Sequence, residues 1–261
     1  MNRRAFVRTL GAAAPLAALA GGAARAQQPA GRTRFYRLQH MYLRQGDQGG
    51  RINQFLSSQM PLLLKNIPHV GVFNTLIGPH NPTIMVLTGY SSFAEMEVVD
   101  ARLGRDSAYQ AALAEMEKGS EPPYDSASLV LLRATDFSPE IVPLAEKPKV
   151  PRIFEVRVYH APTELQLRYL HERFGGAEIP IFHRSGVHPI LYADTIIGPD
   201  MPNLTYVIPF ASLADREKAW DAFGADPDWA KARSESIARG GQIVSANSIT
   251  LMRPAPFSPI Q

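Results

Sequence analysis

A turn segment rich in glycine and proline occurs twice in the chain, as Ile77-Gly-Pro-His-Asn-Pro82 and as Ile197-Gly-Pro-Asp-Met-Pro202. The two copies lie 120 residues apart, and the same offset aligns Phe137-Ser-Pro139 with Phe257-Ser-Pro259. Further identities at this offset are Ser92 with Ser212, Glu97 with Glu217, Gly104 with Gly224, Asp106 with Asp226 and Glu115 with Glu235. So many matches at one spacing indicate an internal repeat. The sequence predicts two units, residues 33–139 and 152–259, joined by a stiff proline-rich linker over residues 140–151.

The second unit reads as an alternation of strands and helices. Residues 152–160 alternate apolar and polar side chains, as a half-buried strand does, and residues 162–174 carry apolar side chains at helical spacing. Segments 190–197 and 204–210 flank the turn and predict a hairpin. A helix over residues 213–223, a second helix capped by Asp226, and a closing strand over residues 243–252 follow. The order β-α-β-β-α-β is that of a ferredoxin-like unit.

Helices cover one face of such a four-stranded sheet, and the other face has to meet something else. Two copies in one chain can pack their bare faces together, so we expect an α+β barrel built from two tandem ferredoxin-like units. The alternation along the first strands gives two facings. We expect one set of side chains to face the helices: Phe154, Val156 and Val158. The other set should line the shared interior: Glu155, Arg157, Tyr159, Arg37 and Gln39. The opposite facing is the alternative.

Residues 1–26 have the pattern of an export signal. Arg3, Arg4 and Phe6 precede a weakly apolar stretch over residues 10–20, and Ala24-Arg-Ala26 resembles a cleavage site. The paired arginines resemble a bacterial twin-arginine (Tat) signal, with an ordinary secretory signal as the alternative. We expect cleavage after Ala26 and a periplasmic or secreted protein. The apolar stretch is shorter than the ~20 residues that span a bilayer, so no stable membrane span is expected.

Charge and composition exclude several classes of function. The chain of 261 residues has 27 basic and 24 acidic side chains, and four of the arginines lie in residues 1–26, which contain no acid. The remaining residues are therefore close to neutral, which argues against binding of nucleic acid. The absence of cysteine excludes disulfides, thiolate metal sites and cysteine nucleophiles.

Several motifs of the second unit together resemble the NIPSNAP family. They are Arg152-Ile-Phe-Glu-Val-Arg-Val-Tyr159, Leu170-His-Glu-Arg-Phe174, Arg216-Glu-Lys-Ala-Trp220, Phe223-Gly-Ala-Asp-Pro-Asp-Trp229 and the tail Phe257-Ser-Pro259. The first unit is a divergent copy, with Asp100 in the place of Trp220 and Ser107 in the place of Pro227. The resemblance implies tandem NIPSNAP-like domains with the dimeric α/β-barrel fold, a homo-oligomer, and a family whose molecular activity is poorly defined.

The wider barrel superfamily that this resemblance implies includes monooxygenases and haem-handling enzymes, an analogy at the level of the fold. It leaves haem or another flat ligand open, while the residues themselves predict no cofactor. His183 and His188 have a metal-like spacing, but Gly186 and Pro189 make a helix there improbable, so no metal site is predicted.

The candidate ligand-binding residues are Arg157, Tyr159, Glu155, His171, Arg37 and Gln39. The Arg157 fork suits a carboxylate, Tyr159 could donate to a second oxygen, and His171 could exchange a proton. These residues predict a small anionic or aromatic ligand. The structural alternatives are an ion pair between Glu155 and Arg157, and a helix histidine at 171 bonded to a backbone carbonyl. Trp220, Phe223 and Trp229 are core anchors or, alternatively, walls for a flat ligand.

We find no nucleophile elbow, no phosphate-binding glycine loop and no catalytic triad in the sequence. The sequence therefore favours a non-catalytic binding or scaffold protein of the cell envelope, whose barrel holds a small molecule or a partner. The alternative is a cofactor-poor oxygenase or isomerase of the α/β-barrel type that uses His171, Arg157 and Tyr159.

Overall fold

The structure, a computed structural model, describes residues 31–261. The first half contains β1 (Phe35–Tyr42), α2 (Gln48–Asn66), β2 (His69–Ile77), β3 (Thr83–Tyr90), α3 (Phe93–Arg105), α4 (Ser107–Glu117) and β4 (Ser126–Ala134). The second half contains β5 (Ile153–His160), α5 (Glu164–Arg173), the π-helical turn η2 (Phe174–Glu178), α6 (Ile179–Ser185), β6 (Leu191–Ile197), β7 (Asn203–Phe210), α7 (Leu213–Ala225), α8 (Pro227–Gly240) and β8 (Ala246–Pro254). The predicted export signal, with Arg3, Arg4 and the cleavage position after Ala26, lies outside the described residues.

The eight strands form a closed antiparallel barrel in the order β1-β3-β2-β8-β5-β7-β6-β4. Two seams join the halves, because β2 pairs with β8 and β4 pairs with β6. The strand pairing closes the barrel within one chain.

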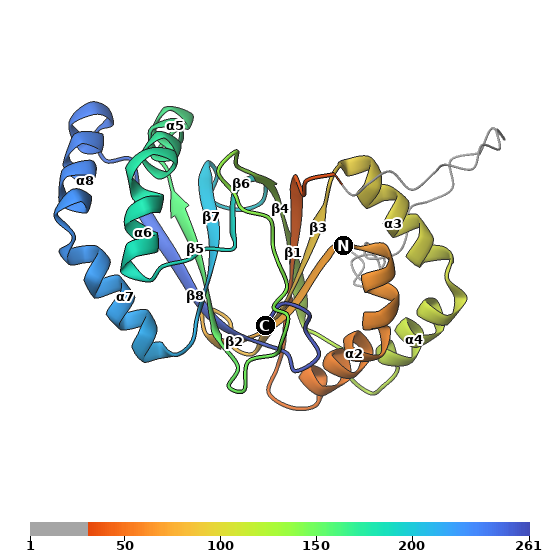
Figure 1. The fold of residues 1–261 in the computed structure, drawn as a ribbon. Helices are drawn as coiled ribbons and strands as arrows, with labels where there is room; N and C mark the ends of the chain where they lie inside the picture. Colours follow the sequence, from red (N-terminus) through yellow and green to blue (C-terminus); the bar gives the residue numbers. More distant parts are fainter. Residues whose placement is uncertain (1–30) are drawn as a thin grey trace.

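Helices cover two opposite sides of this barrel (Figure 1). Helices α2, α3 and α4 lie on one side, α5 to α8 lie on the other, and the strands stand between them. None of the helices over residues 31–261 is long and apolar enough to cross a membrane.

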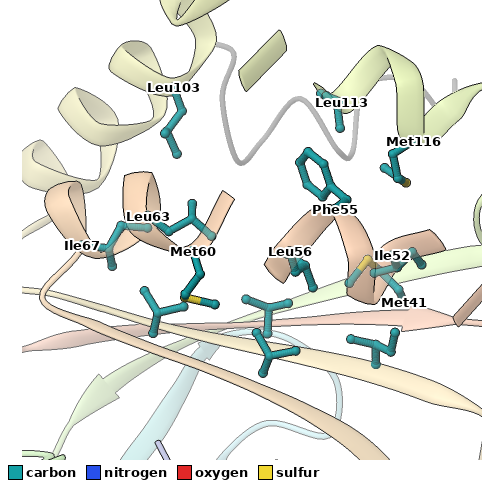
Figure 2. Packing of buried hydrophobic residues seen from close by; sticks show 14 of the residues in the cluster. Met41, Ile52, Phe55, Leu56, Met60, Leu63, Ile67, Leu103, Leu113 and Met116 are labelled. Carbon is teal, nitrogen blue, oxygen red and sulfur yellow. The ribbon is translucent and has the colours of Figure 1, made fainter. Parts of the chain in front are cut away.

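The first half packs α2 between the sheet and the neighbouring helix. Figure 2 shows Leu56 and Met60 of α2 against the strands, while Phe55 on the same helix lies near Leu113 of α4. All of these side chains are buried, and they belong to one apolar cluster. Apolar residues at helical spacing thus bury one broad face of α2, which fixes the helix on the barrel.

The preferred facing of the first strands is corrected by the structure. Phe154 and Val156 belong to the apolar cluster inside the barrel, together with Tyr36 and Leu38 of the first half. Glu155 instead bonds to side chains of α7, so the charged positions of β5 point toward the helices. The physical reason is that buried charge needs partners, and the helices carry them whereas the apolar interior does not. The opposite facing, which alternation alone left open, is the observed one.

Most predicted elements of the second half are confirmed, with two differences at their ends. The hairpin of β6 and β7 and the N-cap at Asp226, whose side chain accepts from the backbone N–H groups of Asp228 and Trp229, are as expected. Strand β8 begins at residue 246 rather than at 243. The helical run also continues beyond Phe174 through η2 and α6, so a helix does include His183.

Helix α6 ends at Ser185 because Gly186 adopts φ 89°, a left-handed conformation that glycine tolerates. His188 therefore lies outside the helix, and its ring stacks on that of His183 with centroids 5.2 Å apart. Over the part of the chain that the structure describes, no group of three or more histidine or acidic side chains could hold a metal ion.

Candidate functional site

A buried charged network connects β5 to α7. Glu155 is 0% exposed, and its carboxylate accepts hydrogen bonds from Nε of Arg157, from Nε of Arg216 and, at 3.2 Å, from Nε1 of Trp220. The Arg157 guanidinium carbon lies 3.6 Å from the centroid of the Trp220 ring. Three donors and a cation–π contact compensate the buried charges, which is what a structural ion pair requires. The structural alternative for Glu155 and Arg157 therefore describes their contacts.

Tyr159 extends this network along the same strand face. Its hydroxyl accepts from Nη1 of Arg157 at 3.4 Å, and its ring meets that of Tyr206 at a centroid distance of 5.2 Å. Burial raises the pKa of Tyr159 above the usual value, so the phenol stays protonated and able to donate. The structure thus brings Glu155, Arg157 and Tyr159 together, between the sheet and the helices rather than inside the barrel.

A second buried pair, which the sequence analysis missed, lies beside Tyr159. Glu178 ends the π-helical turn η2 and is 0% exposed; its Oε2 accepts from Nε of Arg173 at 2.7 Å. Its other oxygen, Oε1, has no hydrogen-bond partner among the described residues. Burial raises the pKa of Glu178 to about 7, so the carboxyl is near half-protonation at neutral pH.

The signal that could have located Glu178 is the pair Gly175-Gly176 inside a helical run. Glycines in a helical pattern mark a position with a special backbone, and π-helical turns occur often at functional sites. The apolar spacing by itself predicts a helix that ends at Phe174, which leaves this segment without a role.

A pocket of about 120 Å³ opens next to this pair, and we name it the Arg173 pocket. Arg173 lies over the Trp229 ring, with 4.9 Å between the guanidinium carbon and the centroid, and its Nη1 donates to Oγ of Ser236 at 3.3 Å. The lining residues are Tyr159, Arg173, Trp229, Arg233, Ile237, Gln242, Ile243, Val244 and Asn247.

The charged side chains that line the Arg173 pocket are all basic. Arg173 and Arg233 line it, and none of the lining residues within 31–261 is an aspartate or a glutamate. Arg173 is 7% exposed and therefore poorly screened by solvent, while Arg233 stands at the exposed rim. Two guanidinium groups beside an aromatic face form an arrangement that suits an anionic group attached to a flat body.

Three of the sequence motifs meet at this pocket. Tyr159 comes from the first strand motif, Arg173 from the helix motif at 170–174, and Trp229 from the motif at 223–229. These residues are far apart along the chain, and β5, α5 and α8 bring them together.

The remaining predicted site residues lie elsewhere. Nε2 of His171 bonds to Oδ1 of Asp194 on β6 at 2.7 Å, a side-chain carboxylate in place of the backbone carbonyl of the structural alternative. In the first half, Arg37 forms a bidentate ion pair with Asp100 of α3: Nη1 donates to Oδ1 at 3.1 Å and Nη2 donates to Oδ2 at 2.7 Å. Gln39 is 2% exposed, and its Nε2 has no hydrogen-bond partner within the described chain. None of these three residues lines the Arg173 pocket.

The space between the sheet and helices of the second half is filled by rings. Phe174 contacts Phe182, Tyr192 and Tyr206 at centroid distances of 5.6 to 5.7 Å, and Phe182 meets Trp220 at 5.5 Å. The Arg173 pocket is also small beside the roughly 300–1,000 Å³ of pockets that bury drug-sized ligands. Its described lining contains no histidine that could ligate iron. These residues do not fit a haem.

Comparison with known proteins agrees with the architecture. The NIPSNAP family model matches residues 154–259, the second half of the chain. A search of curated proteins finds no significant match.

Solved structures share the fold at low sequence identity. A protein named as a monooxygenase, from Fusobacterium nucleatum, has a TM-score of 0.57 at 7% identity and covers 85% of this chain and 93% of its own. A mutant chlorite dismutase from Candidatus Nitrospira defluvii has a TM-score of 0.51 at 9% identity, covering 87% and 94%. A nipsnap family protein with unknown function from Agrobacterium tumefaciens covers 44% of this chain and 97% of its own, at 21% identity and a TM-score of 0.39. The first two show that the chain has the dimeric α/β-barrel fold.

Proposed function

We propose that this chain, whose second half matches the NIPSNAP family, is a binding barrel that holds a small aromatic or otherwise flat molecule with an anionic group. The observation that carries the proposal is the Arg173 pocket, with two arginines, one tryptophan face and no lining carboxylate in the described chain. All of its lining residues lie within the range that the family model matches.

Each part of the ligand would meet a suitable group. The anionic group would bind between Arg173 and Arg233, since a guanidinium donates parallel hydrogen bonds to a carboxylate. The flat body would lie against Trp229, and the protonated Tyr159 could donate a further hydrogen bond. Arg157 has no direct part in this proposal because it is not among the residues that line the Arg173 pocket.

Fluorine NMR and calorimetric titration with 4-fluorobenzoate test the proposal. Arg233→Gln removes an exposed cation of the pocket and should weaken binding about tenfold, as expected for loss of a charge-assisted hydrogen bond. Arg239→Gln is the matched control, because Arg239 is exposed on the same helix and pairs with Glu172 outside the pocket. Absence of binding to the intact chain, or equal losses in the two variants, would contradict the proposal.

A second candidate is a cofactor-poor oxygenase or isomerase in the same pocket. The observation that favours it is Glu178, a carboxyl with a pKa of about 7 that bonds to the pocket residue Arg173 and could take up or release a proton. Some proteins with this fold are named as monooxygenases, although that likeness concerns the fold alone. Chromatography coupled to mass spectrometry of co-purifying compounds, before and after incubation with oxygen, separates the candidates, since an oxygenase would raise the mass and an isomerase would change the retention time, whereas a binding protein would leave both unchanged.

The location and the domain boundaries complete the proposal. Export through a twin-arginine route to the periplasm is supported by residues 1–26 alone. Two tandem ferredoxin-like units over residues 33–139 and 152–259 are supported by strand register, because His40 pairs with Met85 and Ser128 while Val158 pairs with Thr205 and Ser248. Association into a homo-oligomer follows from the family resemblance and is tested by light scattering of the intact chain.

A further inference from the structure

A second pocket, distinct from the Arg173 pocket, opens at one mouth of the barrel. It measures about 120 Å³, and we name it the His40 pocket. Both halves contribute to it: His40 and Thr83 come from β1 and β3, whereas Val156 and Thr250 come from β5 and β8. The pocket therefore exists only in the assembled barrel.

Apolar and aromatic side chains dominate the lining of this mouth. Met85, Met252 and Val156 form apolar walls, and the rings of Tyr42 and His80, with centroids 4.7 Å apart, add aromatic surface. No aspartate, glutamate, lysine or arginine is among the described residues that line it. A charged ligand would lose its hydration here without gaining a counter-charge, so the lining selects an uncharged molecule.

His40 supplies the hydrogen-bonding group of the pocket. Its Nδ1 is buried and has no partner among residues 31–261. Burial lowers the pKa of His40 to about 4, so at neutral pH the ring is uncharged, with one donor and one acceptor nitrogen. The groups that face this ring from the neighbouring strands are Met85 of β3 and Ser128 of β4, and neither carries a charge.

Nearby polar side chains are already bonded to the protein. The hydroxyl of Tyr42 pairs with Oγ of Ser128 at 2.7 Å, and Oγ1 of Thr83 donates to the backbone oxygen of His80 at 2.7 Å. A buried polar atom without a hydrogen bond costs about 1–3 kcal/mol, so the hydrogen bonding of the His40 ring is incomplete within the described chain.

The corresponding positions of the second half lack this arrangement. Val158 takes the place of His40, and Asn203 lies 120 residues after Thr83. The Asn203 side chain accepts from Oγ1 of Thr195 at 2.7 Å and donates to the backbone oxygens of Pro199 and Asp200. An apolar strand residue and a fixed amide thus stand where the first half has an unpaired imidazole and a short threonine.

We propose that the His40 pocket is a second binding site, which takes a small uncharged molecule carrying a hydroxyl or carbonyl group, held by a hydrogen bond to His40 between apolar and aromatic walls. The site lies at the barrel mouth and shares no lining residue with the Arg173 pocket. The two sites therefore differ in ligand charge as well as in place.

The probe for this site is 4-fluorophenol, which is neutral at pH 7 because phenols ionise near pH 10, about as tyrosine does. Fluorine NMR titration of the full chain should show saturable binding. His40→Phe keeps a ring but removes its nitrogens, and it should weaken binding about tenfold. His160→Phe is the matched control. His160 lies on β5, two residues after Val158, which is the counterpart of His40, and its ring is bonded to Ser248. This change should leave binding unchanged.

Thr83→Asn provides a second variant that does not touch His40. It places in the first half the asparagine that the second half has at position 203. Thr75, which also lines the pocket, is the counterpart of Thr195, the residue that bonds to Asn203. The larger side chain should therefore block the pocket in a folded chain. Loss of 4-fluorophenol binding in both variants, with 4-fluorobenzoate binding retained, supports the site. Binding that is equal in His40→Phe and the intact chain, that is absent from the intact chain, or that 4-fluorobenzoate displaces competitively would overturn it.

Discussion

Arg173 and Glu178 form an ion pair five residues apart in sequence, with 2.7 Å between Nε and Oε2, in which both side chains are almost completely removed from water. The arginine also faces the Arg173 pocket, whereas the carboxyl lies behind it and keeps Oε1 without a partner in the described chain. This arrangement couples the charge of the pocket to the protonation of one buried group. Several expected outcomes follow from it and from the barrel around it.

Anion binding should strengthen as the pH falls through about 7. Above that pH the ionised Glu178 neutralises part of the Arg173 charge, and below it the protonated carboxyl does not. We expect the affinity for 4-fluorobenzoate to fall several-fold between pH 6 and pH 8, as for one nearby charge. Isothermal titration in buffers of different ionisation enthalpy should also detect proton uptake. Glu178→Gln should abolish both effects, and an unchanged pH dependence in that variant would rule out Glu178 as their source.

The same carboxyl should make folding stability depend on pH. The pKa of Glu178 is about 7 in the folded chain and near 4.5 in the unfolded chain, so between these values the folded state holds an extra proton. Its contribution to the free energy of unfolding is complete below pH 4.5 and is lost as the pH rises to 7, by on the order of 3 kcal/mol. The difference between the intact chain and Glu178→Gln in urea melts measures it.

His40 acts in the opposite direction, which is why that difference and not the raw curve is needed. Burial lowers the pKa of His40 to about 4, so the unfolded chain binds the extra proton between about pH 4 and 6.5 and stability rises with pH there. A difference curve that stays flat from pH 4.5 to 7 would contradict the role of Glu178.

Glu155→Gln should destabilise the second half strongly. The carboxylate is fully buried and accepts from Arg157, Arg216 and Trp220, so its loss leaves buried cations without compensation. We expect a decrease of about 3–5 kcal/mol in the free energy of unfolding. Glu217→Gln, an exposed change on α7, the helix that carries Arg216 and Trp220, should alter it by about 0.5 kcal/mol or less. Similar small effects in both variants would show that the network adds little to stability.

Neither half should be stable as a soluble monomer. Phe154 and Val156 of the second half pack inside the barrel against Tyr36 and Leu38 of the first, so separation exposes an apolar sheet face. We expect residues 152–261 expressed alone to aggregate or self-associate, as measured by light scattering. A monodisperse monomer with native-like circular dichroism would argue against interdependent halves.

The precursor should depend on its paired arginines for export. Replacing Arg3 and Arg4 by lysines should retain the precursor in the cytoplasm, because the Tat route reads that pair. Exported protein should begin at Gln27, which N-terminal sequencing checks. Unchanged periplasmic yield would favour the ordinary secretory signal.

Local signals in the sequence predict most elements of the second half, in their order, and the residues that share each strand face. The reason is that periodicity, turn residues and caps act over a few neighbours: the turn at 197–202 marks the β6–β7 hairpin, and Asp226 begins α8. Alternation also grouped Glu155, Arg157 and Tyr159 correctly on one face of β5.

The tertiary structure alone decided which layer each face meets. Alternation of apolar and polar residues along a strand shows which side chains share a face, but not which layer of the protein that face contacts. The partners of Glu155 lie about 60 residues away, on α7. Glu178 became a candidate functional residue because it is buried and paired with Arg173. His40 became one because strands of the other half help to form its pocket. Burial and charge compensation arise from contacts between segments distant along the chain: the Arg173 pocket forms where elements of the second half pack together, and the His40 pocket forms only in the closed barrel.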